Sequence, residues 1–358
     1  MPKRHRIMVL LLLTWAPLVI LAAAAGVAVG DAVGLPLLLD YTTNVRFLVA
    51  MPVLMGAEGI VWGRVGDLAR YLIRSGVVAE SSMPALEQLV VRFDARRTAR
   101  IIPALVAVGV VFGVLFLRKE YAGDLSTWQF VPGSSGQVRS AAGWWNLLVS
   151  VPIFQFLILY WAVRYALWCW FLFRLSRLGF VLLPSHPDRS GGLRPIGQVH
   201  QYWSIVIFAI SSLISANVGL AIVHGRSLSD FRLELITFLG LSLIVLFAPF
   251  LAFSGKLYEA RMSGLFAYGE LAAAYTRRFD TKWTGSNLPG DDLLGTADIQ
   301  SLADLANSYA VVHGLRLVPF EMLNVVVMVV AVVLPFAPLV FVVVSPIEVA
   351  RQIIQILL

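Results

Sequence analysis

The sequence is poor in cysteine and in charged side chains. Its one cysteine, Cys169, excludes an intrachain disulfide and a metal site built from several cysteines. Charged residues make up 14% of the chain, whereas soluble domains carry about 25%. Hydrophobic residues make up 59%, and the mean hydropathy is +0.81. A chain this apolar cannot cover its surface with polar groups, so we expect much of that surface to face lipid.

Several sequence motifs of catalytic and cofactor sites are also missing. The chain has no Walker A loop, no GxGxxG, no HExxH and no GxSxG. Its five histidines are scattered, and none forms a pair at helical spacing inside an apolar run. We therefore expect no metal and no cofactor. The net charge of +7 comes from arginines next to apolar runs, which favours contact with anionic lipids on the cytoplasmic side over nucleic acid.

Seven apolar runs are long enough to cross a hydrocarbon core, which takes about 20 residues. They predict an all-α, polytopic integral membrane protein with one membrane domain over residues 1–358. The first run follows MPKRHR and has features of a secretory signal, but its length favours an uncleaved helix. Cleavage would leave six spans. The predicted spans are 7–30, 43–62, 101–118, 144–173, 202–223, 234–254 and 322–344.

The basic residues are distributed unevenly between the two sides of these spans. With the N-terminus in the cytoplasm, 20 of the 28 Lys and Arg residues fall on the cytoplasmic side, and seven fall on the other. Arg164 lies within a span. Because cytoplasmic loops carry the excess of Lys and Arg, the sequence predicts a cytoplasmic N-terminus and a C-terminus on the opposite side.

Two predicted cytoplasmic segments, 63–100 and 256–318, are too long to be plain connectors. In the first, two helical stretches are expected, the second beginning after Ser81-Ser82. In the second segment, helices are expected over about 256–275 and 297–312. The latter carries an apolar stripe that we expect to pack on another cytoplasmic helix or on the membrane surface, with docking of a partner protein as the alternative. The stripe consists of Ile299, Leu302, Leu305, Tyr309 and Val312.

Ionisable residues within the predicted spans are rare. Glu58 and Arg164 lie at similar depth in two spans that run in the same direction, so the sequence predicts an ion pair between them. The pair is interpreted either as a structural link between helices or as part of a gate or proton relay.

Small residues suggest close helix packing in three of the spans. Ser211, Ser215 and Asn217 lie in the fifth span, where a hydrated pathway is the alternative to packing. The first and third spans carry GxxxG pairs, which favour close approach of two helix backbones. Two prolines predict a kink in the last span. The pairs are Gly26/Gly30 and Gly109/Gly113, and the prolines are Pro335 and Pro338.

The loop at 182–197, LLPSHPDRSGGLRPIG, is dense in special residues. One interpretation is a rigid turn in which prolines restrict the chain, an aspartate caps it and glycines admit a positive φ. The other is a small polar site that binds an anion or exchanges protons. The residues concerned are His186, Asp188, Arg189, Gly191, Gly192 and Arg194.

The stretch FRLSRLGFVLLPSHPDRSGGL, together with ADIQSLADLANSY and LVPF, resembles a family of uncharacterised bacterial multi-pass membrane proteins. The resemblance covers most of the chain between residues 174 and 320. It implies a bacterial inner-membrane protein, in which the C-terminus that the Lys and Arg distribution places outside would be periplasmic. It implies no activity and assigns no functional residues.

Three classes of function are compatible with these observations. The polar residues within the spans favour a channel or transporter. The large helical cytoplasmic face favours a non-catalytic scaffold or signalling partner. The loop at 182–197 alone favours a membrane-embedded enzyme that acts on lipid or phosphate groups. The sequence leaves the catalytic residues, the substrate and the presence of a homo-oligomer undetermined.

Overall fold

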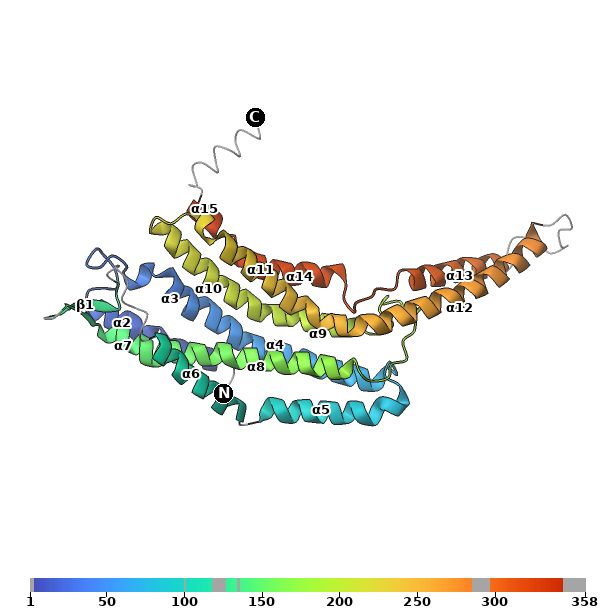
Figure 1. Cartoon of the computed structure of the whole chain (residues 1–358), viewed down its shortest axis with the longest axis horizontal. Coiled ribbons are helices and arrows are strands. Elements are labelled where there is room, and N and C mark those ends of the chain that lie inside the picture. The colour runs from blue at the N-terminus through green and yellow to red at the C-terminus, as the bar shows by residue number, and fades with distance from the viewer. Residues whose placement is uncertain (1–2, 100, 118–126, 134–135, 285–296, 344–358) are drawn as a thin grey trace, which may run out of the picture.

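The computed structural model describes residues 3–99, 101–117, 127–133, 136–284 and 297–343. The described chain is mainly helical, as predicted. Six helical stretches within it are long and apolar enough to cross a membrane. The long helices lie side by side, and those that follow one another along the chain run in opposite directions (Figure 1). The six stretches are His5–Ala24, Tyr41–Arg74, Ala141–Leu175, Arg194–Val223, Leu228–Trp283 and Met322–Val342.

The remaining predicted span, 101–118, is helix α6 (Ile101–Leu117). Residues 118–126, which follow it, lie outside the described part of the chain. The GxxxG pair of α6 packs closely on a neighbouring helix, as predicted. A Cβ added at Gly109 would lie 3.3 Å from the Leu159 side chain, and one at Gly113 would lie 3.2 Å from the Gln155 amide.

The first predicted span, 7–30, is shorter in the structure. Two helices, α1 (Lys3–Thr14) and α2 (Ala16–Ala24), occupy its first part. The chain leaves the helix before Gly26 and Gly30, whose φ angles are +69° and +87°. The prediction that this glycine pair packs within a helix was therefore wrong. The short helix η1 (Leu37–Leu39) precedes the next span.

Other helices are longer than predicted. The second span continues to Arg74, so the first helical stretch of segment 63–100 belongs to the same helix. The sixth passes from α11 (Arg232–Phe247) through η7 (Ala248–Phe250) into α12 (Leu251–Trp283), so no separate helix begins at 256. The fifth begins at 194 rather than 202, as α9 (Arg194–His200), η5 (Gln201–Trp203) and α10 (Ser204–Val223). Hydropathy alone does not reveal these boundaries, because each helix extends into polar sequence.

Two helices share an unusual local structure at positions 100 residues apart. In one, α3 (Tyr41–Val45) leads through the π-helical segment η2 (Arg46–Ala50) into α4 (Met51–Arg74). In the other, α7 (Ala141–Trp145) leads through the π-helical segment η4 (Asn146–Ser150) into α8 (Val151–Leu175). A proline follows each π segment at the second position of the next helix, Pro52 and Pro152. A proline ring clashes with the carbonyl four residues earlier, and a wider π turn relieves that clash.

The two ends of the helix bundle differ in structure. One end carries the hairpin of β1 (Phe130–Gly133) and β2 (Gly136–Arg139), which pair antiparallel, and η6 (Leu228–Phe231). We call it the hairpin end. These strands were not predicted from the sequence, and they lie within the expected loop between the third and fourth spans.

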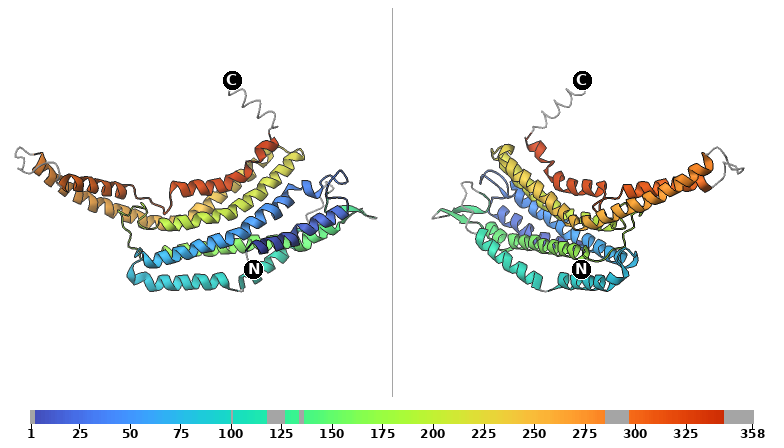
Figure 2. Two further views of the ribbon diagram at one scale, coloured as in Figure 1. Left: turned by 180° about the vertical axis from the view of Figure 1, so that it is seen from behind. Right: turned by 45° about the vertical axis from the view of Figure 1, so that its right-hand side comes forward.

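The opposite end, which we call the arm end, carries a helical projection. It is formed by the distal part of α12 and by α13 (Ala297–His313), which lie side by side (Figure 2). Lys282 Nζ and Trp283 Nε1 donate to Asp298 Oδ2 over 2.8 and 3.1 Å, and these bonds hold the pKa of that carboxyl below its usual value. The predicted apolar stripe of α13 faces α12 over part of its length: Ile299 is exposed, Leu302, Leu305 and Tyr309 are half-buried, and Val312 is buried.

Two further elements bear out the sequence patterns. Helix α5 (Met83–Thr98) begins after the η3 turn (Glu80–Ser82), where the start of a helix was predicted. The last span is interrupted where its prolines lie, with α14 (Met322–Val333) and α15 (Leu339–Val343) separated by η8 (Leu334–Phe336).

An aromatic cluster fills the centre of the bundle. Trp203 lies there, with the rings of four aromatic side chains around it at centroid distances of 5.4 to 6.0 Å. Trp161, Trp168 and Trp203 are almost completely buried. The four neighbours come from α4 and α8 and are Trp62, Trp161, Tyr165 and Trp168.

Candidate functional site

A polar cavity of about 430 Å³ lies at the hairpin end of the bundle. Its walls come from α3, the two π-helical segments, the start of α8, the β-hairpin and α10. Polar side chains from all of these elements line it, and Leu147, Phe154, Leu213 and Leu220 contribute apolar surface. The polar lining consists of Asp40, Thr42, Thr43, Arg46, Thr127, Gln129, Arg139, Asn146, Gln155 and Asn217.

Three buried atoms of this lining have no hydrogen-bond partner among the described residues. They are Thr42 Oγ1, Asn146 Oδ1 and Gln155 Oε1. Asn146 is only 4% exposed. Because leaving a buried polar group unsatisfied costs about 1–3 kcal/mol, such groups indicate a place where a polar molecule can bind.

The single carboxylate of the cavity wall is engaged in protein hydrogen bonds. Asp40 Oδ1 accepts from the Thr43 backbone at 3.0 Å, and Oδ2 accepts from Thr43 Oγ1 at 2.7 Å and from Trp128 Nε1 at 3.0 Å. Asp40 thus caps α3 and fixes it to the segment that precedes the hairpin. The charged side chains that remain in the lining are both arginines. Arg46 lies 5.9 Å from the Phe154 ring, and Arg139 lies 4.8 Å from the Phe130 ring.

The polar residues predicted in the fifth span do not form one site. Asn217 lines the polar cavity. Ser215 lines a neighbouring cavity of about 720 Å³ whose walls, from α3, α10, η8 and α15, are mainly apolar. Ser211 is buried, and its hydroxyl has no partner among the described residues. These surroundings favour helix packing over a hydrated pathway along the serines.

The predicted ion pair between Glu58 and Arg164 is present in the structure. Arg164 Nη1 lies 2.9 Å from Glu58 Oε1. The Arg164 side chain is 8% exposed and that of Glu58 is 50% exposed, so the pair lies at the edge of the bundle. The guanidinium also lies 4.0 Å from the Tyr160 ring and 5.0 Å from the Trp62 ring. It therefore links α4 and α8 next to the aromatic cluster.

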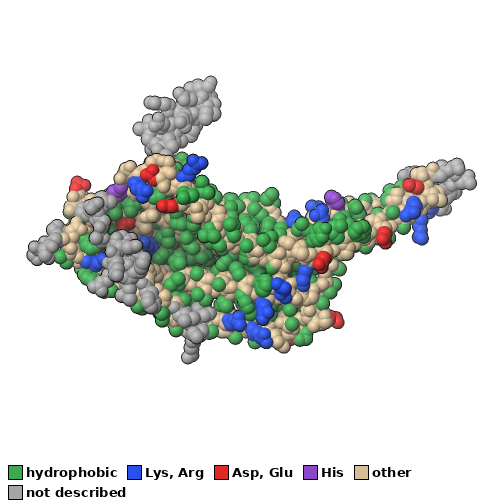
Figure 3. Space-filling view, in the orientation of Figure 1, with side chains coloured by type: hydrophobic (Ala, Val, Ile, Leu, Met, Phe, Trp, Pro, Cys, Tyr) green, Lys and Arg blue, Asp and Glu red, His purple; other side chains and the backbone are tan. Residues whose placement is uncertain are grey.

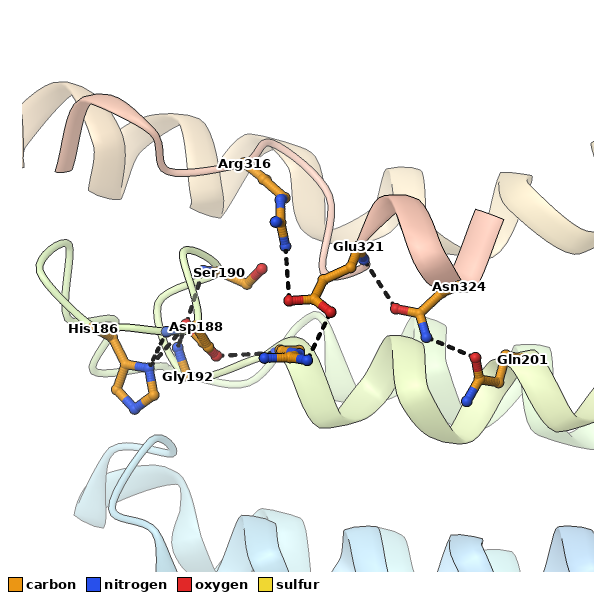
Figure 4. A network of polar contacts seen from close by, with 9 residues as sticks. His186, Asp188, Ser190, Gly192, Gln201, Arg316, Glu321 and Asn324 are labelled. Carbon is orange, nitrogen blue, oxygen red and sulfur yellow. Dashed lines mark hydrogen bonds and ion pairs between the residues drawn. The ribbon is translucent and has the colours of Figure 1, made fainter. Parts of the chain in front are cut away.

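The loop at 182–197 is an ordered turn organised by Asp188. Asp188 Oδ1 accepts from the backbone nitrogens of Ser190 at 2.8 Å and Gly192 at 3.1 Å, and Oδ2 accepts from that of Arg194 at 3.2 Å. His186 Nδ1 lies 2.8 Å from Oδ1. Figure 4 shows these contacts converging on the carboxylate. The aspartate cap predicted for a turn is thus present, although α9 already begins at Arg194.

The loop is also tied to neighbouring elements. Arg189 has a φ of +52°, and its carbonyl accepts from the Arg316 backbone at 2.9 Å. The Gly192 carbonyl accepts from Tyr71 Oη at 2.7 Å. Gly191 and Gly192 have φ angles of +61° and +94°, which side chains with a Cβ rarely adopt.

A second polar cavity, of about 480 Å³, lies at the arm end next to this loop. Arg194 Nη2 lies 2.6 Å from Glu321 Oε2, and Arg316 Nη1 lies 3.7 Å from Glu321 Oε1. Asn324 donates to Gln201 Oε1 at 2.7 Å and caps the start of α14 with Glu321 (Figure 4). Its polar lining comprises Arg64, Asp67, Tyr71, Arg194, Gln198, Gln201, Tyr202, Glu321 and Asn324.

The aromatic cluster lies between the two polar cavities. His200 is completely buried in it, and Trp168 Nε1 donates to His200 Nδ1 at 2.9 Å. His200, Arg46 and Asn146 were not among the residues predicted from the sequence. For His200 the signal was available, since it precedes an apolar run within a short helix. For the other two it was not, because their roles depend on π turns that hydropathy does not reveal.

Comparisons with known protein families, with curated proteins and with solved structures found no match. Among the described residues, no group of three or more His, Cys, Asp and Glu side chains is arranged to hold a metal ion. The assignment of the candidate site therefore depends on the geometry of its residues alone.

Proposed function

We propose that this chain is an integral membrane transport protein, and that the polar cavity at the hairpin end is its substrate site. The observation that carries the proposal is the set of buried, unpartnered polar groups that line this cavity. Polar groups inside an apolar bundle are costly, and they commonly mark the path of a solute or ion. A volume of about 430 Å³ lies within the range of small-molecule pockets.

The second polar cavity and the aromatic cluster support the same proposal. Cavities at opposite ends of a bundle, separated by packed side chains, are expected of a transporter closed at its centre. The side chains around Trp203 form this barrier. The Glu58–Arg164 pair adjoins the barrier through Trp62, which makes it a candidate for coupling the opening of the barrier to a change in charge.

We also propose an orientation in the membrane. The excess of arginine at the arm end favours a cytoplasmic arm and a periplasmic hairpin. The family resemblance supports a bacterial inner membrane. The substrate cavity would then face the periplasm.

One observation favours a second function, the docking of a protein on the arm. Phe266 and Leu271, which are 68% and 53% exposed, lie on α12, the helix whose distal part projects beyond the bundle (Figure 2). The enzyme alternative has less support, because the carboxylate of the 182–197 loop is fully engaged by the loop's own backbone.

Thiol labelling in a Cys169→Ser background tests whether the cavity is hydrated. Asn217→Cys places a thiol in the cavity. Ile236→Cys, near the start of α11, is the matched control, because Ile236 is 58% exposed and does not line the cavity. A membrane-impermeant reagent should label Asn217→Cys and leave Ile236→Cys unlabelled in lipid vesicles. Equal labelling, or none at either position, would contradict a water-accessible cavity within a membrane.

A ligand screen tests whether the cavity selects a solute. Purified protein is melted in detergent with small carboxylates, phosphates, sugars and amino acids. Any solute that stabilises it is then tested for uptake into proteoliposomes. Asn146→Leu should abolish both effects for that solute, whereas Ser215→Ala, in the neighbouring apolar cavity, should preserve them. A solute that stabilises the protein but is never transported would contradict the transport proposal and indicate a receptor.

A further inference from the structure

A groove rich in arginine lies between α5 and the C-terminal part of α8. It encloses about 200 Å³, and no carboxylate lines it. The apolar part of its wall is formed by Ala85, Leu89, Trp170 and Leu178, and the polar part by Gln88, Arg92, Arg174 and Arg177.

The three arginines carry positive charge that this part of the structure does not neutralise. Arg92, Arg174 and Arg177 make no ion pair with any described Asp or Glu, and all three are exposed. Lys256 lies on the same side, where it donates to the Leu178 carbonyl. Helix α5 carries two acids: Asp94 is paired with Arg97, and Glu87 makes no ion pair with the three arginines. Three neighbouring guanidinium groups without an ion-pair partner repel one another, and an anion between them would relieve that repulsion.

The position of the groove along the bundle indicates what kind of anion it meets. The apolar helix α6 begins at Ile101, three residues after α5 ends at Thr98. Arg96 lies 4.2 Å from the Trp170 ring, so this tryptophan marks the level at which the apolar part of α8 gives way to arginine. Tryptophan and arginine are characteristic of the headgroup level of a bilayer. Figure 3 shows a row of basic side chains across the lower part of the molecule, with hydrophobic and uncharged atoms around it.

We propose that this groove binds the phosphate of an anionic phospholipid from the leaflet at the arm end. Guanidinium groups donate two parallel hydrogen bonds to phosphate oxygens, and Gln88 adds an amide donor. Leu89 and Trp170 face the first carbons of the lipid. The proposal depends on membrane insertion but not on transport, so either can fail without the other.

The test compares two pairs of arginines at the same end of the molecule. Arg174→Gln/Arg177→Gln removes two charges from the groove. Arg277→Gln/Arg278→Gln removes two from the arm and serves as the control. Each purified protein is titrated with phosphatidylglycerol in nanodiscs of phosphatidylcholine, and bound lipid is counted by native mass spectrometry. We expect the groove variant to lose about tenfold in affinity, or about 1.4 kcal/mol, and the control to lose less than twofold. Equal losses of affinity in both variants would overturn the proposal, because lipid binding would then depend only on the net charge of the protein and not on the groove.

Two further measurements are needed. One distinguishes a lipid phosphate from free phosphate, and the other checks that the variants fold. Excess inorganic phosphate should not displace the lipid; if it does, and if it stabilises the protein equally well alone, the groove is a site for free phosphate and the lipid proposal fails. Thermal unfolding in detergent checks that the variants are folded. Should the glutamine pair not fold, Arg174→Lys/Arg177→Lys keeps the charge but lacks the planar donor geometry. This pair should still bind phosphatidylglycerol more weakly than the parent, and undiminished binding would overturn the proposal.

Discussion

Asp188 is the residue on which the conformation of the 182–197 loop depends. Its carboxylate accepts three backbone hydrogen bonds and is almost buried, with a side chain 9% exposed. Asp188→Asn keeps one oxygen acceptor and loses the charge, so we expect a loss of about 1–3 kcal/mol in the free energy of unfolding. Chemical denaturation in detergent measures it. Asp67→Asn, at a half-exposed surface pair, should change it by less than about 1 kcal/mol. Equal losses would contradict an organising role for Asp188.

Arg164 is predicted to contribute more than its partner Glu58. Arg164→Gln removes the ion pair and two contacts with aromatic rings, whereas Glu58→Gln removes only the ion pair. Because Glu58 is half-exposed, we expect its loss to be about 1–2 kcal/mol, below the 3–5 kcal/mol of a fully buried pair. In a double-mutant cycle the double variant should be more stable than the sum of the single losses predicts. Strict additivity would show that the two side chains do not interact.

These two sites were accessible from the sequence, whereas the cavity was not. Asp188 stands between prolines and glycines, and Glu58 and Arg164 are charges in apolar runs, so residue type alone pointed to them. Asn146 and Arg46 look like ordinary residues at the edge of a span. Only the meeting of two π-helical segments with α10 places them around one cavity, and that meeting depends on contacts between residues about 100 positions apart.

At the scale of elements, the two π-helical segments are a shared device that shapes the cavity. Both η2 and η4 line it, and each precedes a proline. A π turn holds one residue more than a turn of α-helix. Converting it to α-helix would therefore rotate the preceding helix about its axis by the angle of one residue, about 100°. The sequence predicted both helices from hydropathy but not their π turns. The two prolines were visible in the sequence, but a proline near the start of an apolar run is also compatible with an ordinary kink.

Replacing both prolines tests this role. Pro52→Ala/Pro152→Ala removes the clash that favours the π turns, so η2 and η4 should relax toward α-helix. We expect the free energy of unfolding to stay equal or to rise, because alanine is the better helix former. Labelling of Asn217→Cys should fall at least severalfold, because the lining residues turn away. Pro103→Ala, near the start of α6 and outside the cavity lining, is the control. Unchanged labelling in the double variant would show that the two prolines do not determine the shape of the cavity.

At the scale of the whole molecule, hydropathy was sufficient to predict the membrane-spanning helices but not where each helix begins and ends. The apolar part of each helix was recognised, because it is long enough to cross a membrane by itself. Helical stretches were also predicted beyond the spans in α4 and α12, but not their continuity with those spans, since the extensions are amphipathic and are stabilised by contacts with loop 176–193 and with α13. Val181 donates to the Val77 carbonyl at 2.9 Å, for example, and so joins two segments that follow different helices.

The proposed path of the solute depends on the orientation of the molecule in the membrane. If the arm is cytoplasmic, a thiol on the hairpin and a thiol on the arm must react from opposite sides of the membrane. Gln137→Cys on β2 and Thr281→Cys near the end of α12 are both exposed and both described. In a Cys169→Ser background, an impermeant reagent added to intact cells should label Gln137→Cys alone. In inverted vesicles it should label Thr281→Cys alone. The reverse pattern would place the arm outside, against the arginine distribution, and labelling of both thiols from one side would show that the bundle does not span the membrane. With the predicted pattern, the polar cavity opens toward the outside, and the arginine groove meets the inner leaflet, where anionic lipids give the cytoplasmic surface its negative potential.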